Sequence, residues 1–151
     1  MTASDMGSTQ HIQLKGMVLN YTNFAGEPNT FGKVQREFML QLDDDEAEIC
    51  TRAGLVTHVG RFSKHLLRVR IGPTFTDHTR FRVSKYPIVV AFEGELFQIH
   101  EGNIHELDVP NDSGILRGDV TINPHHWKVG GNTGISAYLV HAELVYLEPP
   151  F

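Results

Sequence analysis

Basic residues are concentrated in one stretch of a chain that is acidic as a whole. The 151 residues include 13 Lys and Arg against 18 Asp and Glu, a net charge of −5. Between Arg61 and Lys85, however, seven residues are basic and only Asp77 is acidic. Such a cluster can present a local positive field to a polyanion despite the negative net charge. Ion pairs between this block and the acidic segments beside it are the alternative interpretation.

Aromatic residues stand next to basic residues in several segments that lack a regular apolar pattern. Phe31 precedes Lys33 and Arg36, and Trp127 precedes Lys128. Single-stranded nucleic acid is bound by cationic grooves together with aromatic faces that stack on bases. The candidate nucleic-acid-binding residues are Phe24, Phe31, Lys33, Arg36, Arg61, Lys64, Arg68, Arg70, Arg80, Arg82, Lys85, Tyr86, Trp127 and Lys128. Because large aromatic side chains are usually buried, we expect about half of the candidate rings to belong to the core.

Motifs of catalysis and metal binding are absent from the sequence. It contains no GxSxG, GxxxxGK[ST], GxGxxG, HExxH or paired CxxC pattern. Nine histidines are present, but the adjacent His125 and His126 would point to opposite faces of a strand and could not share one ion with His141. We therefore expect no enzyme activity, no cofactor and no metal site.

Short strand-like segments must position the candidate residues. Residues 66–71 alternate so that Arg68 and Arg70 share one face while Leu67, Val69 and Ile71 pack inward. Further strands are expected over 11–20, 35–42, 81–85, 87–92 and 96–100. Two long runs, 115–129 and 135–147, are joined by a glycine-rich connection and predict a terminal β-hairpin.

One short helix interrupts this pattern. Asp43, Asp44 and Asp45 offer an N-cap and acidic first-turn residues, and Gly54 stops the helix after Ala53. These carboxylates therefore predict a structural role. The fold class is mostly β with one helix, and we expect an OB-fold-like five-stranded barrel plugged by that helix and carrying a long C-terminal hairpin.

The chain has the size of a single domain. We expect a flexible leader over residues 1–9 and one OB-like domain over 10–151. The single cysteine, Cys50, cannot form an intramolecular disulfide, which favours a reducing compartment. No apolar run approaches the roughly 18 residues of a membrane span, and the polar start lacks the order of a signal peptide. A cytoplasmic protein without membrane contact is predicted.

Two ordered motifs stand in the N-terminal and C-terminal parts of the chain. Residues 122–139 contain Pro-x-x-Trp, a glycine-bearing turn and then Gly-Ile-x-Ala-x-Leu. Upstream, Asn23-Phe24-Ala25-Gly26 is followed by Arg36-Glu37-Phe38 and by Leu42-Asp43-Asp44, which leads into a helix. In this order the segments, which cover a little over half of the chain, resemble the single-stranded-DNA-binding proteins of tailed phages. Residues 87–114 are acidic and do not match, and the long acidic C-terminal tail familiar in this family is missing.

The resemblance implies an OB fold that binds single-stranded DNA without strong sequence preference during phage replication, recombination or repair, in the host cytoplasm. It also implies phage or host replication and recombination proteins as partners, and leaves a homo-oligomer open. The end Glu148-Pro149-Pro150-Phe151 is similar to the Pro-Phe tip by which bacterial single-strand-binding proteins dock partners, although a trimmed strand end is the better explanation because only Glu143 and Glu148 lie nearby.

A protein-binding module is the alternative function. The acidic segments 43–48 and 93–112 could form a surface that mimics DNA, as in a phage inhibitor of a host nuclease or defence enzyme. The two functions differ in the surface that they use. DNA binding would depend on the basic block, whereas the inhibitor would depend on the acidic segments.

Overall fold

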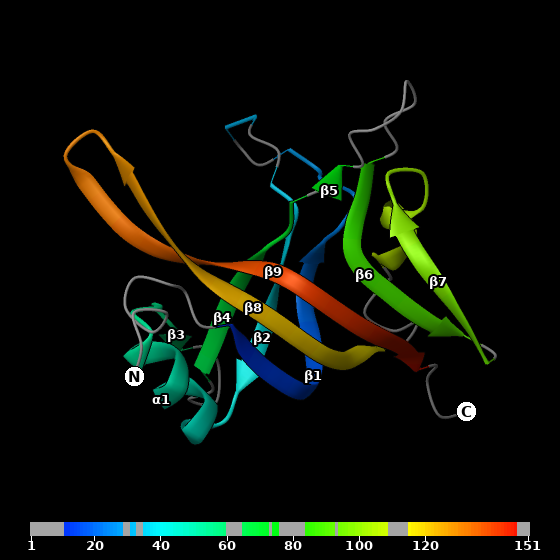
Figure 1. Cartoon of the computed structure of the whole chain (residues 1–151), viewed down its shortest axis with the longest axis horizontal. Coiled ribbons are helices and arrows are strands. Elements are labelled where there is room, and N and C mark those ends of the chain that lie inside the picture. Colours follow the sequence, from blue (N-terminus) through cyan, green and yellow to red (C-terminus); the bar gives the residue numbers. More distant parts are fainter. Residues whose placement is uncertain are drawn as a thin grey trace, which may run out of the picture.

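The computed structural model describes residues 11–28, 31–32, 35–59, 65–72, 74–75, 84–92, 94–108 and 115–147. These residues form a mostly β structure with one α-helix (Figure 1). Its elements in chain order are β1 (Ile12–Asn23), β2 (Glu37–Leu42), α1 (Asp44–Arg52), β3 (His58–Val59), β4 (His65–Arg70), β5 (Thr74–Phe75), β6 (Ser84–Phe92), β7 (Glu95–His100), the 3-10 turn η3 (Ile104–Leu107), β8 (Ile115–Val129) and β9 (Asn132–Leu147).

Five strands close into a ring. β1 pairs antiparallel with β2 and β8, β2 pairs with β4, and β8 pairs with β9. A parallel contact between β4 and β9 completes the ring. This closure is the arrangement expected for a five-stranded OB-like barrel, and the predicted fold class is confirmed.

The inward faces of the ring strands follow the predicted alternation. Phe38, Leu40 and Leu42 of β2 are buried, and so are Leu67 and Val69 of β4. The matching face of β9 contributes Ala137, Leu139, Ala142 and Leu144. Register is therefore well specified, because a shift by one residue would move each of these apolar sets into solvent.

The helix begins where the sequence predicts. Asp43 accepts a hydrogen bond from the backbone N–H of Glu46, whose side chain accepts one from the backbone N–H of Asp43. This reciprocal cap confirms a structural role for part of the acidic cluster. Cys50 on the inner side of the helix is fully buried, and burial together with the nearby Glu46 raises the pKa of its thiol to about 11.

The middle of the chain differs from the expectation of two strands over 81–85 and 87–92, of which residues 81–83 lie outside the described residues. A single strand, β6, runs from Ser84 through Pro87 to Phe92. Its register with β7 shifts between Lys85 and Val89, and such an irregularity lets proline sit in a paired strand. β6 also runs parallel to β9, so the inserted β6–β7 hairpin extends the barrel sheet.

The loop between β1 and β2 is anchored by this insertion. Both carboxylate oxygens of Asp108 accept hydrogen bonds, one from the backbone N–H of Phe24 at 2.8 Å and the other from that of Ala25 at 2.7 Å. The Phe24 side chain is 0% exposed and packs against Phe38 with ring centroids 5.9 Å apart. The structure therefore corrects the expectation that Phe24 stacks on bases, because its ring is part of the core.

Arg36 and Tyr86 belong to the same anchor. Arg36 donates to the Phe24 carbonyl at 2.8 Å and to Glu101 at 3.0 Å, and its guanidinium lies 5.5 Å from the centre of the Tyr86 ring. The Tyr86 hydroxyl donates to the other oxygen of Glu101, and the residue is 2% exposed. Tyr86 is therefore part of the core, which corrects the expectation that it stacks on bases, whereas the Arg36 side chain is engaged by internal partners and is 23% exposed.

β8 and β9 approach each other so closely at Gly118 that this position has no room for a side chain. A Cβ at this position would lie 2.0 Å from the Glu143 carbonyl oxygen. Gly118→Ala should therefore lower the free energy of unfolding by about 1–3 kcal/mol through overpacking, measured by urea denaturation. Gly131→Ala is the control, since a Cβ there meets nothing within 4 Å. Equal stability of the two variants would contradict the close approach.

The Tyr86–Glu101 hydrogen bond predicts a pH-dependent contribution to stability. Burial and this bond raise the pKa of Tyr86 to about 12 from its usual 10. The unfolded tyrosine therefore ionises first, so the stabilisation is complete below pH 10 and is lost as the pH rises through 12. In urea titrations, wild type should exceed Tyr86→Phe in stability at pH 8, and the gap should shrink by pH 11. A gap that is constant or widens would show that the folded-state pKa is not raised.

Candidate nucleic-acid interface

One outer face of the barrel combines basic and aromatic side chains. Arg70 of β4 is in register with Tyr138 of β9, and Gly134 of β9 is opposite Trp127 of β8. Residues in register share a side, and so do residues two apart along a strand. The face consists of Arg68, Arg70, Ser136, Tyr138, His125 and Trp127, and we call it the β4–β9 seam face.

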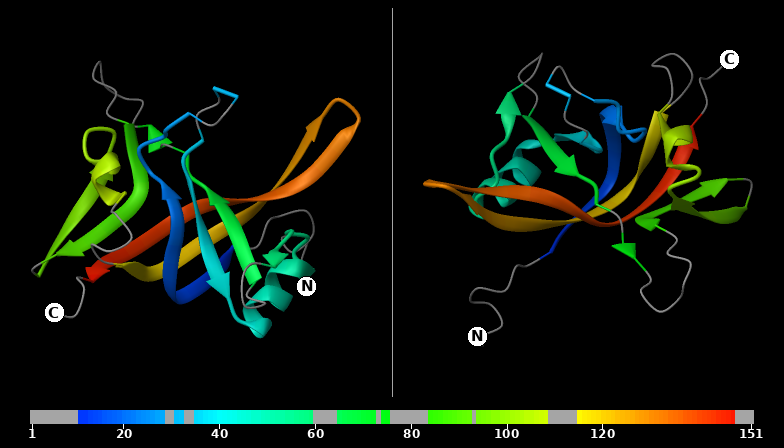
Figure 2. Two further views of the ribbon diagram at one scale, coloured as in Figure 1. Left: turned by 180° about the vertical axis from the view of Figure 1, so that it is seen from behind. Right: turned by 90° about the horizontal axis from the view of Figure 1, so that it is seen from above.

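The end of the β8–β9 hairpin projects from the barrel (Figure 2). Trp127 lies near this end, opposite Gly134. Its ring packs against Gly134, where a Cβ would lie 2.3 Å from a ring carbon. The indole N–H donates to the Ser136 hydroxyl at 3.1 Å. These two contacts fix the ring orientation and leave Trp127 38% exposed. An oriented and partly exposed indole is suited to stacking on a flat ligand.

A pair of aromatic side chains extends the seam face along the hairpin. The His125 and Tyr138 rings meet edge to face with centroids 5.3 Å apart. Tyr138 is opposite Asn123 on β8 and in register with Arg70 on β4. Its ring therefore lies between the aromatic and the basic part of the seam face.

The two arginines differ in their surroundings. Arg68 pairs with Glu37 through a distance of 3.0 Å between Nε and Oε2, so part of its charge is compensated. Within the described part of the chain, Arg70 makes no ion pair, although Glu37 is its register neighbour on β2. Arg70 is therefore the stronger of the two as a free positive charge for a phosphate.

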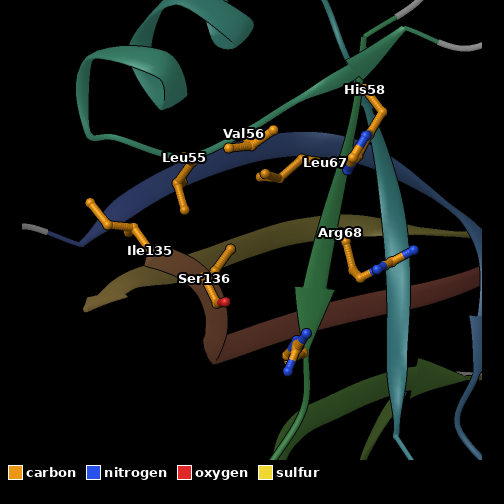
Figure 3. A pocket seen from close by; sticks show the side chains of 9 residues that line it. Leu55, Val56, His58, Leu67, Arg68, Ile135 and Ser136 are labelled. Carbon is orange, nitrogen blue, oxygen red and sulfur yellow. The ribbon is translucent and has the colours of Figure 1, made fainter. Parts of the chain in front are cut away.

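A hollow of about 120 Å³ lies beside these arginines (Figure 3). Leu55 and Val56 reach it from the segment after α1, and Ile135 and Ser136 from the start of β9. Gly54 helps to bring these segments together, since a Cβ on it would lie 2.4 Å from the Ile135 side chain. Its φ of +90° also suits the end of the helix.

The structure brings together only part of the predicted set. Arg68, Arg70 and Trp127 share the seam face, whereas Lys128 alternates with Trp127 and projects from the other side of the hairpin. Lys85 lies on β6 opposite His100, and Phe31 is 91% exposed in the β1–β2 loop. The remaining predicted residues lie outside the described residues, namely Lys33, Arg61, Lys64, Arg80 and Arg82.

Sequence reasoning missed Ser136 and Tyr138. Their signal was present, because strict alternation along Ile135–Leu139 places both on the face opposite Ala137 and Leu139. What the alternation could not reveal is the pairing of β9 with β4, which joins residues about 70 positions apart. The pairing of β9 with β4 brings Ser136 and Tyr138 next to the arginines of β4.

The described residues contain neither a metal-binding cluster nor a membrane-spanning helix. Among the described residues, no group of three or more His, Cys, Asp or Glu is placed to hold a metal ion. No helix in those same ranges has the length and apolarity required to cross a membrane.

Comparisons with known proteins concern the fold. No family model matches the chain, and no curated protein does. The solved single-stranded DNA-binding protein from bacteriophage Enc34 is similar, with a TM-score of 0.55 and 13% identity over 93% of this chain and 82% of that chain. The same protein in complex with ssDNA gives the same TM-score and identity over 93% and 88%. The fold of this chain thus resembles that of a phage single-stranded-DNA-binding protein, as the sequence motifs predicted.

Proposed function

We propose that this protein binds single-stranded DNA, without strong sequence preference, on the β4–β9 seam face. One observation carries the proposal: β-sheet register places Arg68 and Arg70 on the same surface as the oriented rings of Trp127 and Tyr138. Cationic groups beside stacking rings are what a single strand requires, because its phosphates and its base faces are both accessible.

The location of the seam face within the barrel supports this proposal. OB folds bind oligonucleotides on the face of their second and third ring strands, flanked by the loops at one end. Here those strands are β2 and β4, and the seam face begins on β4. The Enc34 protein of similar fold has been solved with ssDNA, which agrees with this use of the architecture.

The biological setting is part of the proposal. The proposed role is in phage DNA replication, recombination or repair, and the fold and the motifs of residues 23–54 and 122–139 support it. Non-catalytic binding in the host cytoplasm fits that role, with phage or host replication proteins as further partners.

Phosphate contacts predict a marked salt dependence. Fluorescence anisotropy of a labelled thirty-base oligothymidine should show roughly fifty-fold weaker binding at 200 mM than at 50 mM salt if about four phosphates are neutralised. Arg70→Ala should weaken binding about fivefold near 0.1 M salt and reduce the salt slope by about 0.7. Arg52→Ala is the control, because Arg52 is an exposed helix residue paired with Glu48.

Two results would contradict the proposal. One is the absence of binding to the single strand at low salt, and the other is a salt slope that does not change in Arg70→Ala. Binding to a host nuclease that is lost in Asp44→Asn/Asp45→Asn, with no DNA binding, would instead favour the acidic inhibitor. Asp44 and Asp45 are suitable for that test because the reciprocal cap uses Asp43 and Glu46.

Trp127 provides a direct signal, since it is the single tryptophan of the chain. Stacking of a base on the indole should quench the intrinsic fluorescence as oligothymidine is added. Trp127→Ala should weaken binding by about 1–3 kcal/mol, whereas Trp127→Phe should retain most of the affinity because a stacking ring remains. Circular dichroism should show both variants folded. Unchanged emission at saturating DNA would exclude Trp127 from the interface.

A further inference from the structure

The β3–β4–β9 junction contains a gap in the hydrogen-bonded ladder. On one edge of β4, β3 pairs with His65 and Leu66, and β9 pairs with Val69 and Arg70. Between these two contacts, Leu67 and Arg68 have no register partner on that edge among the described residues. The hollow lies at this gap and includes both residues in its lining. Strand backbone that lacks a neighbouring strand can offer hydrogen bonds to another group.

The remaining walls combine apolar and polar groups. Val56 and Ile135 supply aliphatic surface, and Leu55 and Ala137 are buried around the hollow. The Ser136 hydroxyl accepts from Trp127 and therefore still has its own hydrogen to donate. Figure 3 shows the Ser136 side chain on the Ile135 side of the hollow and Arg68 on the opposite side, on β4.

The size of the hollow limits what can enter. A cavity of about 150 Å³ lined by aliphatic side chains accepts one benzene molecule. At about 120 Å³, the hollow can cover one six-membered ring, and the second ring of a purine would extend from its open side into solvent. Its position next to Arg70 and Trp127 places such a ring within the proposed path of the strand.

We propose that this hollow receives one base of the bound single strand and favours a pyrimidine. The base contacts Val56 and Ile135, and its polar edge bonds to the Ser136 hydroxyl and to the backbone of whichever of Leu67 and Arg68 turns its N–H and C=O away from β2. The sugar and phosphate stay outside, next to the arginines. This inference rests on the proposed function and adds a base preference to an otherwise sequence-tolerant surface.

Filling the hollow tests the inference. Val56 lines it and is 68% exposed, so Val56→Trp can place an indole across it without disturbing the core. Val59 is a matched control, since it is 69% exposed on β3 and does not line the hollow. The dissociation constants for thirty-base oligothymidine and oligodeoxyadenosine are measured for wild type, Val56→Trp and Val59→Trp. Self-stacking of the adenine strand affects all three proteins equally.

Wild type and Val59→Trp should prefer oligothymidine roughly five- to tenfold, the effect of one base contact. In Val56→Trp this preference should fall towards unity, mainly through weaker binding of oligothymidine. Ser136→Ala, which removes the hydroxyl and fills nothing, should reduce the preference in the same direction.

The two proposals fail in distinguishable ways. Failure of the wild-type protein to bind either oligonucleotide would overturn the proposed function. Salt-sensitive binding of both, with no preference or with a preference that Val56→Trp leaves unchanged, would overturn the base pocket alone. Tighter binding of both strands by Val56→Trp, without a change in their ratio, would overturn it as well.

Discussion

The parallel contact between β4 and β9 is the constraint on which the rest of the structure depends. It consists of two register pairs, Val69 with Ala137 and Arg70 with Tyr138. The first pair faces inward and is buried. The second pair faces outward and brings an arginine beside an aromatic ring. Closure of the barrel and assembly of the seam face are therefore one event. Because a parallel pair requires a long connection, the intervening chain has room for the inserted hairpin.

Local features of the fold could be predicted well from the sequence. The alternation at Leu67–Ile71, the reciprocal cap at Asp43 and the long terminal hairpin each depend on residues close in the chain, and each is confirmed. The division of this region into two strands at Tyr86 was wrong, because a register irregularity lets one strand continue through Pro87. Strand order and the extension of the sheet by β6 depend on distant pairings that local patterns do not encode.

The sequence predicted which types of residue form the candidate site, but it was less successful at identifying the individual residues. Phe24 and Tyr86 stand in polar, loop-like sequence, yet their rings are buried by contacts with residues that are distant in the chain. Arg36 looked available because its acidic partner, Glu101, lies 65 positions away. The pattern of alternation correctly placed Arg68 and Arg70 on one face of β4, since facing direction along a strand is a local property.

The anchor between the β1–β2 loop and Asp108 couples two segments that are 84 positions apart. Two backbone N–H groups depend on the carboxylate of Asp108, which follows η3, and Glu101, directly after β7, holds Arg36. If related genes exchanged only one of the two segments, hydrogen-bond donors or acceptors in the remaining segment would lose their partners. Recombination should therefore preserve both segments together, and substitutions at Asp108 and in the loop should accumulate in a correlated way.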